Sequence, residues 1–235
     1  MNMVSEALNQ VNGLSGFGSG DMFAARKDSA SVRKLDDLSA VIIRKHSAGF
    51  QAENVQAFAD ALEEALDEQP KFMVFDFAHR SHLTNARAGV AGFPELIHAC
   101  ANLIMNSSTI AVAWARGPMA GADLEFALSC SMIAAEAPAT FLPSSHGTAY
   151  TFLARKIGLS RAENLMLESE ELSAATMKNM LLARHVEEQV DGGDVAVENF
   201  IRTNMRRHNA LAHMYKAQRL VMPVPFEMVK AAQAS

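Results

Sequence analysis

The sequence predicts an α/β fold followed by a helical C-terminal region. Between about residues 38 and 135, short apolar runs that suit buried strands alternate with segments of helical periodicity, and the links are short. After about residue 148 the helical pattern dominates. Hydrophobic residues make up 49% of the 235-residue chain, which is enough to bury a core. Alternation of this kind is typical of parallel strands joined by crossover helices.

The elements of the α/β part follow from apolar runs and their spacing. Strands are expected at 38–45 (LSAVIIRK), 71–77, 109–115 and 132–135, and helices at 52–66, 93–106 and 122–129. In the first helix, Val55, Phe58 and Leu62 lie on one face, and Pro70 follows the helix as a terminator. Pro94 suits a first helical turn, where a missing N–H costs little.

The C-terminal part is expected to be helical. Helices are predicted at 148–157, 161–167, 173–182, 195–207 and 210–221, with a brief strand at 185–188 and a turn at 192–193. We therefore divide the chain into a flexible lead (1–35), an α/β core (36–190) and a helical region (191–235). The predicted helices after residue 148 carry many apolar residues, such as Leu165, Leu181 and Leu182. One domain is not expected to bury all of them, which suggests self-association.

Composition excludes several classes of partner. A net charge of -5 gives no general attraction to nucleic acid or to anionic membranes. No apolar run reaches membrane-spanning length, and the Gly/Ser-rich lead lacks the basic and apolar segments of a secretory signal. Cys100 and Cys130 lack metal-binding spacing, so reduced, buried thiols are expected. A cytoplasmic location is predicted.

The stretch GPMAGADLEFALSC, residues 117–130, predicts a tight turn that opens into a helix. Gly121 permits unusual dihedral angles, and the helix that follows offers unpaired N–H groups and a partial positive charge to an anion. Ala122 and Glu125 are three residues apart and share a helical face, so an N–H and a carboxylate can address one pocket. That pair suits enolate chemistry. Carboxylates are also common in the first turn of ordinary helices, because they interact favourably with the helix dipole. From spacing alone, this structural role is preferred to a catalytic one.

Two polar clusters are interpreted structurally. Asp76, His79 and His82 form D-x-x-H-x-x-H after a strand, where metal binding is chemically feasible, but a hydrogen-bonded polar loop is preferred and no metal is assigned. The basic stretch 206–208 suits a solvated helix face better than a docking point for phosphates or an acidic carrier protein.

Residues 109–143, TIAVAWARGPMAGADLEFALSCSMIAAEAPATFLP, resemble the signature region of the crotonase (enoyl-CoA hydratase/isomerase) superfamily. Within it, AYTFLARKIG and MLESEELSA look closest to the bacterial cis-2-unsaturated fatty acid signal synthases. The resemblance implies a spiral of ββα units whose C-terminal helices drive assembly into a homotrimer or hexamer. It also implies that the substrate is an acyl thioester of CoA or of acyl carrier protein, with no further cofactor.

The resemblance assigns roles to single residues. Glu125 falls on the first catalytic glutamate, and Ala122, next to Gly121, falls on the glycine whose N–H is half of the oxyanion hole. The other donor is expected in the loop after strand 71–77, with 85–88 as the nearest counterpart. Asp123 stands where the family usually has glycine.

The second catalytic glutamate of the family is missing from this chain. Ser144 occupies its position, in a shortened loop. His146 is the candidate to replace the lost proton carrier and to contact substrate, because imidazole titrates near neutrality, although a solvated loop histidine is the commoner role. Three functions follow: an enzyme that acts on acyl thioesters, a degenerate homologue that binds a thioester or protein without turnover, or a scaffold without a ligand.

Overall fold

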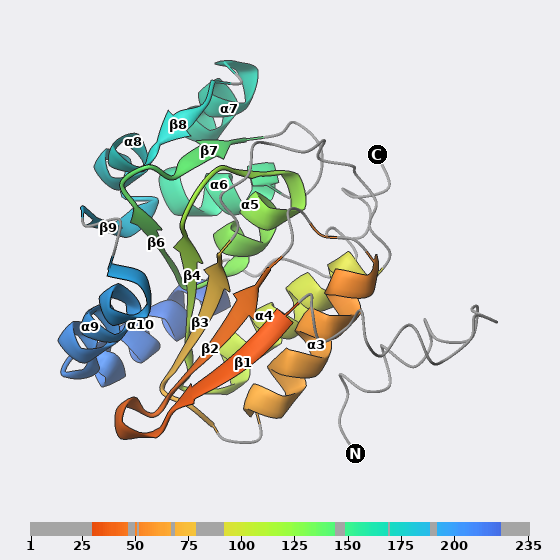
Figure 1. The fold of residues 1–235 in the computed structure, drawn as a ribbon. Coiled ribbons are helices and arrows are strands. Elements are labelled where there is room, and N and C mark those ends of the chain that lie inside the picture. The colour runs from red at the N-terminus through yellow and green to blue at the C-terminus, as the bar shows by residue number, and fades with distance from the viewer. Residues whose placement is uncertain are drawn as a thin grey trace.

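A six-stranded sheet with the order β1-β2-β3-β4-β6-β9 forms the centre of the computed structural model (Figure 1). The structure describes residues 30–46, 50, 52–66, 69–78, 92–143, 149–168, 170–188 and 192–221. The strands are β1 (Ala30–Leu35), β2 (Ala40–Lys45), β3 (Phe72–Phe77), β4 (Ile110–Ala115), β6 (Met132–Glu136) and β9 (Ala183–Glu187). β1 runs antiparallel to β2, and the other neighbours are parallel.

Helices cover both faces of this sheet. Figure 1 shows α3 (Ala52–Leu66) and α4 (Phe93–Asn106) on one side and α9 (Gly193–Met205) on the other. The last helix, α10 (His208–Val221), packs against α4 and β4. The sheet register explains the division, because alternate residues of a strand face opposite sides. Phe75 and Phe77 of β3 contact Phe58 of α3, whereas Trp114 of β4 contacts Phe200 of α9.

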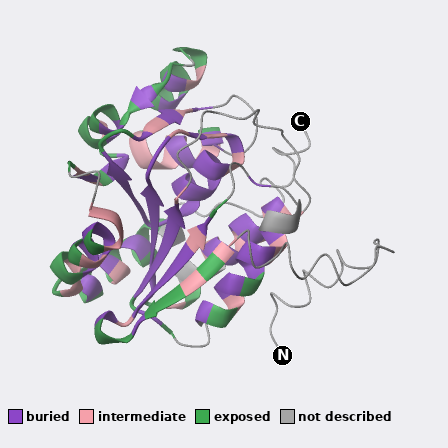
Figure 2. Ribbon diagram, in the orientation of Figure 1, coloured by how far each residue is buried: buried purple, intermediate pink, exposed green. Residues whose placement is uncertain are grey.

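The core lies in the central strands. Every residue of β3, β4 and β6 is buried, which is the pattern of a parallel sheet covered on both faces (Figure 2). The edge strand β1 alternates instead between exposed and partly buried residues. Catalytic groups of an α/β sheet collect at the carboxyl ends of its parallel strands, so this end is the place to search.

A second sheet lies beyond those carboxyl ends, with the order β5-β7-β8. Its strands are β5 (Met119–Ala120), β7 (Thr140–Leu142) and β8 (Leu172–Ser173). The remaining helical elements are η2 (Asp36–Leu38), α5 (Gly121–Ser129), α6 (Ala149–Ile157), α7 (Leu159–Glu168) and α8 (Ala174–Asn179). α5 connects the two sheets, since it follows β5 directly and leads into β6.

Most predicted elements are confirmed, and the α/β fold with a helical end is correct. Helices 52–66 and 93–106 have the predicted bounds. Residues 30–35, assigned to the lead, form β1, and the rest of the lead lies outside the described residues. The helix predicted at 173–182 is shorter, because Ser173 caps its start and Leu181 has a left-handed φ of 61°. The brief strand spans Ala183–Glu187 rather than 185–188.

Two global expectations from composition can be compared with the structure. Cys100 and Cys130 are free and buried, as predicted. Among the described residues, no helix is both long and apolar enough to cross a lipid bilayer.

Candidate functional site

The start of α5 is built by a turn that only glycine adopts easily. β4 ends at Ala115, and the chain passes through β5 to Gly121, whose φ is +51°. A side chain there would be strained, because L-residues rarely adopt this region. Ala120, the residue before the helix, is extended and makes no side-chain cap. The chain therefore changes at Gly121 from the extended backbone of β5 to the helix α5.

Ala122 and Glu125 both lie in α5, so the predicted helical spacing is present. The first four N–H groups of a helix, which include that of Ala122, have no acceptor within the helix. Glu125 is buried, with 6% of its surface exposed, and Ala122 is partly buried against the core. The Glu125 side chain is therefore not directed into bulk solvent.

The neighbouring stripe of α5 faces the sheet. Phe126 packs on Phe75 with a centroid distance of 4.8 Å and on Phe58 at 5.3 Å. Asp123 lies three residues earlier on the same stripe, and its Oδ1 is 3.3 Å from Nζ of Lys45. Lys45 is the last residue of β2, and its side chain is only 1% exposed. A buried lysine thus reaches the first turn of the candidate catalytic helix.

Asp76 is held by arginines. Arg116 donates from Nε to Oδ1 at 2.7 Å and from a terminal nitrogen to Oδ2 at 2.9 Å, and Arg44 donates from Nε to Oδ2 at 2.8 Å. Arg116 also donates to Glu136 at 2.8 Å. The Arg116–Asp76 contact is bidentate, and all of these hydrogen bonds are charge-assisted. The fully buried Asp76 therefore has a structural role, because arginines occupy both of its carboxylate oxygens. His79 and His82 lie outside the described residues.

The arginine cluster continues to α9. Asp194 accepts from Arg44 and from Arg33, and Arg33 also binds Glu198 at 2.7 Å. Burial raises the pKa of Asp194, but the hydrogen bond and charge of Arg44, together with the charges of Arg33 and Arg116, outweigh it and leave that pKa below its ordinary value. The cluster therefore attaches the C-terminal region to the sheet.

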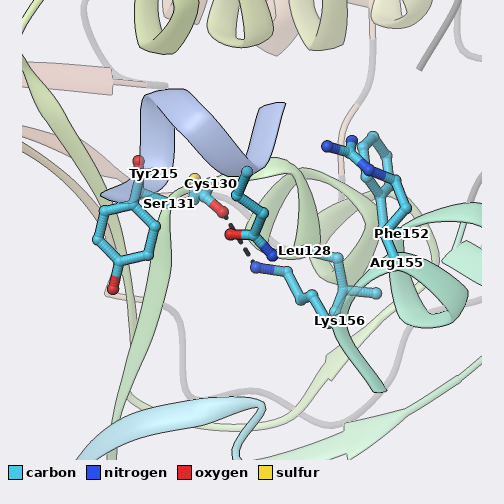
Figure 3. Close-up of a pocket in the computed structure, with 8 residues that line it drawn as sticks. Leu128, Cys130, Ser131, Phe152, Arg155, Lys156 and Tyr215 are labelled. Atoms are coloured by element: carbon cyan, nitrogen blue, oxygen red, sulfur yellow. Dashed lines mark hydrogen bonds between the residues drawn. The ribbon is translucent and has the colours of Figure 1, made fainter. Parts of the chain in front are cut away.

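Two cavities formed by described residues lie away from Ala122 and Glu125. Figure 3 shows the first, of about 10 Å³, at the other end of α5, where Lys156 donates to the carbonyl oxygen of Cys130 at 3.2 Å. This volume is near that of one water molecule and cannot admit an acyl chain. The second, of about 600 Å³, lies between α8, β9, α9 and α10, and its lining includes Arg184, His185 and Phe200.

Comparison with solved structures identifies the architecture. An enoyl-CoA hydratase from Mycobacterium avium subsp. paratuberculosis K-10 superimposes with a TM-score of 0.66 at 19% identity, over 88% of this chain and 87% of that chain. An enoyl-CoA hydratase/isomerase from Cupriavidus metallidurans CH34 gives 0.66 at 19% identity, over 88% and 86%. A methylmalonyl CoA decarboxylase complexed with 2S-carboxypropyl CoA gives 0.65 at 12% identity, over 87% and 88%.

The chain has the crotonase fold. No family model matches the sequence, and no curated protein matches it significantly. At 12–19% identity, these neighbours establish the architecture and leave the chemistry to be argued from the site. The crotonase architecture predicted from residues 109–143 is confirmed.

The crotonase fold brings together some of the predicted residues and leaves others undescribed. Gly121, Ala122 and Glu125 share the first part of α5. His146 and Ser144 lie outside the described residues, as does the loop 85–88 expected to supply the second oxyanion donor. Their proposed roles therefore remain predictions.

Sequence reasoning missed Lys45. The signal was present but incomplete: Asp123 puts a charge into a buried helix start, which requires a counter-charge nearby. Lys45 ends an apolar run and could have been read as a solvated strand end. In the structure, β2, β3 and β4 are parallel, so Lys45 lies at the same end of the sheet as Ala115, where the chain leaves β4 toward α5. Its pairing with Phe77 puts its side chain on the face that α5 covers.

Proposed function

We propose that this protein binds an acyl thioester, of CoA or of acyl carrier protein, and acts on its acyl group through a stabilised enolate. The buried Glu125 carboxylate, three residues after an N–H at the start of α5, is the observation that carries the proposal. The crotonase fold and the neighbours named as enoyl-CoA hydratases support it. The narrower resemblance to cis-2-unsaturated fatty acid signal synthases rests on sequence alone.

Each group has a defined chemical task. The thioester carbonyl oxygen accepts a hydrogen bond from the Ala122 N–H, which stabilises the negative charge that develops when a proton leaves the adjacent carbon. Glu125 accepts that proton and returns it to the acyl chain. The low exposure of Glu125 keeps water from competing for its carboxylate.

One carboxylate favours a particular reaction class. A hydratase in this family uses two glutamates, and Ser144 stands at the position of the second. A double-bond shift removes a proton from one carbon and places it on another, so a single carboxylate completes it. Isomerisation is therefore the first reaction to assay, with hydration or dehydration and thioester cleavage as the other outcomes of an oxyanion-stabilising site.

The decisive experiment replaces Glu125 by glutamine and measures turnover of enoyl-CoA and enoyl-acyl carrier protein panels. Loss of one general acid/base should lower kcat by about 100-fold or more while the far-UV circular dichroism stays unchanged. Glu163→Gln, on the exposed surface of α7, is the matched control and should keep full activity. Unchanged turnover of the Glu125→Gln variant would remove Glu125 from the mechanism.

A second candidate function is binding without turnover. The absence of a glutamate at position 144 and the charged Asp123 at a position where the family usually has glycine both favour it. Calorimetry with a non-hydrolysable acyl-CoA analogue, paired with the turnover assay, separates the two. Saturable binding with no detectable product from any member of the panel would replace the enzymatic proposal by this one.

Self-association is proposed as part of this function. Leu159, Leu167 and Leu181 are 66%, 76% and 77% exposed. Leu165 and Leu182, also expected to need a partner, are buried within the chain itself. A homotrimer or hexamer would cover the exposed leucines, and light scattering at micromolar concentration should give a mass three or six times that of the chain. A monomeric mass would contradict it.

A further inference from the structure

Lys45 is a buried cation next to the candidate site, and the proposed reaction gives it no role. It is the last residue of β2, and its position on the strand places it on the sheet face that carries Phe75 and Phe77. Its side chain is 1% exposed. An ammonium is costly to bury without compensation, so its position implies a specific partner.

Asp123 is that partner, and it comes from the first turn of α5. Asp123 Oδ1 lies 3.3 Å from Lys45 Nζ. Residues three apart share a helical face, so Asp123 with Phe126 forms the sheet-facing stripe, and Ala122 with Glu125 forms the next. A rotation of the helix that moved Asp123 away from Lys45 would turn the Ala122 N–H and the Glu125 carboxylate with it.

The surroundings of the pair are apolar. Lys45 Nζ lies 4.8 Å from the centre of the Phe50 ring, and that ring contacts Phe126 at 5.8 Å. Burial lowers the pKa of Lys45, and the negative charge of Asp123 opposes that shift. In such a medium the attraction between opposite charges is strong and screened little by salt. The pair therefore restricts the helix start more than a surface ion pair would.

The helix start has no side-chain cap at Ala120, and Gly121 is the residue with the fewest steric restrictions. Strand pairing of Ala120 with Leu142 fixes the chain just before the helix, and Phe126 packs on the main sheet one turn later. Between these two points, the Lys45–Asp123 ion pair joins the first turn, where the proposed oxyanion donor lies, to β2 of the main sheet.

We propose that Lys45 and Asp123 are positioning residues, whose ion pair sets the rotation of the first turn of α5 and thereby directs the Ala122 N–H and the Glu125 carboxylate at one substrate. This inference rests on the proposed acyl thioester activity. The proposal also explains why an aspartate stands at position 123, where the family usually has glycine.

The test compares Lys45→Met, Asp123→Asn and the double variant with Lys34→Met. Lys34 lies on β1 and forms an ion pair with Glu64 at 3.7 Å, with 40% of the Lys34 side chain exposed, so it is a matched surface control. Kinetics per folded site, and hydrogen exchange of the amides of 121–125, are measured for each. The double variant carries no buried charge at this position, so it stays informative if a single variant folds poorly.

Each single variant should lose about 100-fold in kcat, because a displacement near 1 Å at reacting groups has this effect, while KM changes little. Amides 121–125 should exchange faster. The double variant should lose no more than the worse single variant, because the two residues act as one unit, and Lys34→Met should match the original protein. A merely stabilising pair would lower the unfolding midpoint and leave kcat per folded site unchanged, which would overturn the proposal.

The exchange measurement separates the two proposals. If Glu125→Gln retains activity but the variants of Lys45 and Asp123 release the amides of 121–125, the proposed function fails and the structural half of the inference stands. If Glu125→Gln abolishes activity while Lys45→Met keeps both kcat and slow exchange, the positioning inference alone is overturned.

Discussion

The two faces of the main sheet bury charge in different ways. On the α9 face, three arginines and four carboxylates form a continuous cluster that becomes more exposed from the sheet toward α9: Arg33, Arg44, Arg116, Asp76, Glu136, Asp194 and Glu198. On the α5 face, Lys45 and Asp123 pair within a group of phenylalanine rings. One face distributes its charge over many arginine–carboxylate contacts, and the other places a lysine–aspartate pair among aromatic rings.

The difference suggests different tasks. A cluster with several partners for each guanidinium tolerates small shifts, because hydrogen bonds can be shared, and it suits the attachment of a C-terminal helix. An ion pair in an apolar environment favours a defined geometry, and the Lys45–Asp123 pair lies where the proposed chemistry needs one. We therefore expect changes on the α9 face to affect stability, and changes at the Lys45–Asp123 pair to affect activity as well.

Removal of Phe126 should produce the largest loss of stability, because the α5 face depends on its aromatic packing. Phe126 contacts Phe50, Phe58, Phe75 and Phe77 and is fully buried. Phe126→Ala should lower the free energy of unfolding by about 3–5 kcal/mol, as measured by urea denaturation. Tyr150→Ala, an aromatic truncation on the exposed side of α6, should change it by about 0.5 kcal/mol or less. Equal effects would show that α5 is not held by this cluster.

Neutralisation of Asp76 should damage the opposite face nearly as much. Asp76→Asn leaves the guanidinium groups of Arg44 and Arg116 without their shared carboxylate inside the protein. A loss of about 3 kcal/mol in the free energy of unfolding is expected. Asp60→Asn, at an exposed position of α3, is the control and should stay within about 0.5 kcal/mol of the original protein. Stability of Asp76→Asn near that of the control would contradict the structural role of the cluster.

A substitution at Gly121 should separate stability from activity. Gly121 and Gly158 both have positive φ, at +51° and +86°. Alanine at either position should lower the free energy of unfolding by about 1–2 kcal/mol, because L-residues are strained there. Only Gly121→Ala should also lower kcat, since it displaces the first turn of α5. Equal activities of the two variants would mean that this turn does not take part in the reaction.

Sequence alone predicted the elements that depend on local pattern. Helices 52–66 and 93–106 were placed correctly because their apolar spacing and flanking prolines are local signals. The short strands β5, β7 and β8 have two or three residues each, which is too few to show periodicity. β1 was missed because Ser31, Arg33 and Lys34 make it polar, as suits an edge strand, and this composition resembled a polar lead.

Sequence alone predicted the site residues that lie together in one helix. Gly121, Ala122 and Glu125 lie within five residues, so one motif could place them. Lys45 and Asp123 are 78 positions apart, and their contact depends on the parallel arrangement of β2, β3 and β4. The partnership of Asp76 with Arg116 is likewise a product of tertiary structure, because the two residues are 40 positions apart and lie on neighbouring strands or just beyond them.

Acid should weaken the α9 face through Asp194. Its folded-state pKa lies below the ordinary 3.8, so its contribution to stability is full above that value and is lost as the pH falls through the lower folded-state pKa. The difference in urea midpoint between the original protein and Asp194→Asn should therefore be constant near neutrality and shrink below about pH 4. A difference that grew on acidification would reverse the assigned sign.

The smallest effect is expected at the outer margin of the α9 face, where Arg202 of α9 meets Asp37 of η2 at 2.7 Å. Both side chains are more than half exposed, at 55% and 61%, so water and salt compete with the pair. Arg202→Ala should lower the free energy of unfolding by about 0.2–1 kcal/mol in dilute buffer and by less in 1 M salt. Asp76→Asn should keep most of its loss at both salt concentrations, because Asp76 and Arg116 are buried. If the loss for Arg202→Ala were the same in 1 M salt, exposure would not decide the strength of these ion pairs. The buried cluster and its exposed margin would then hold α9 equally well.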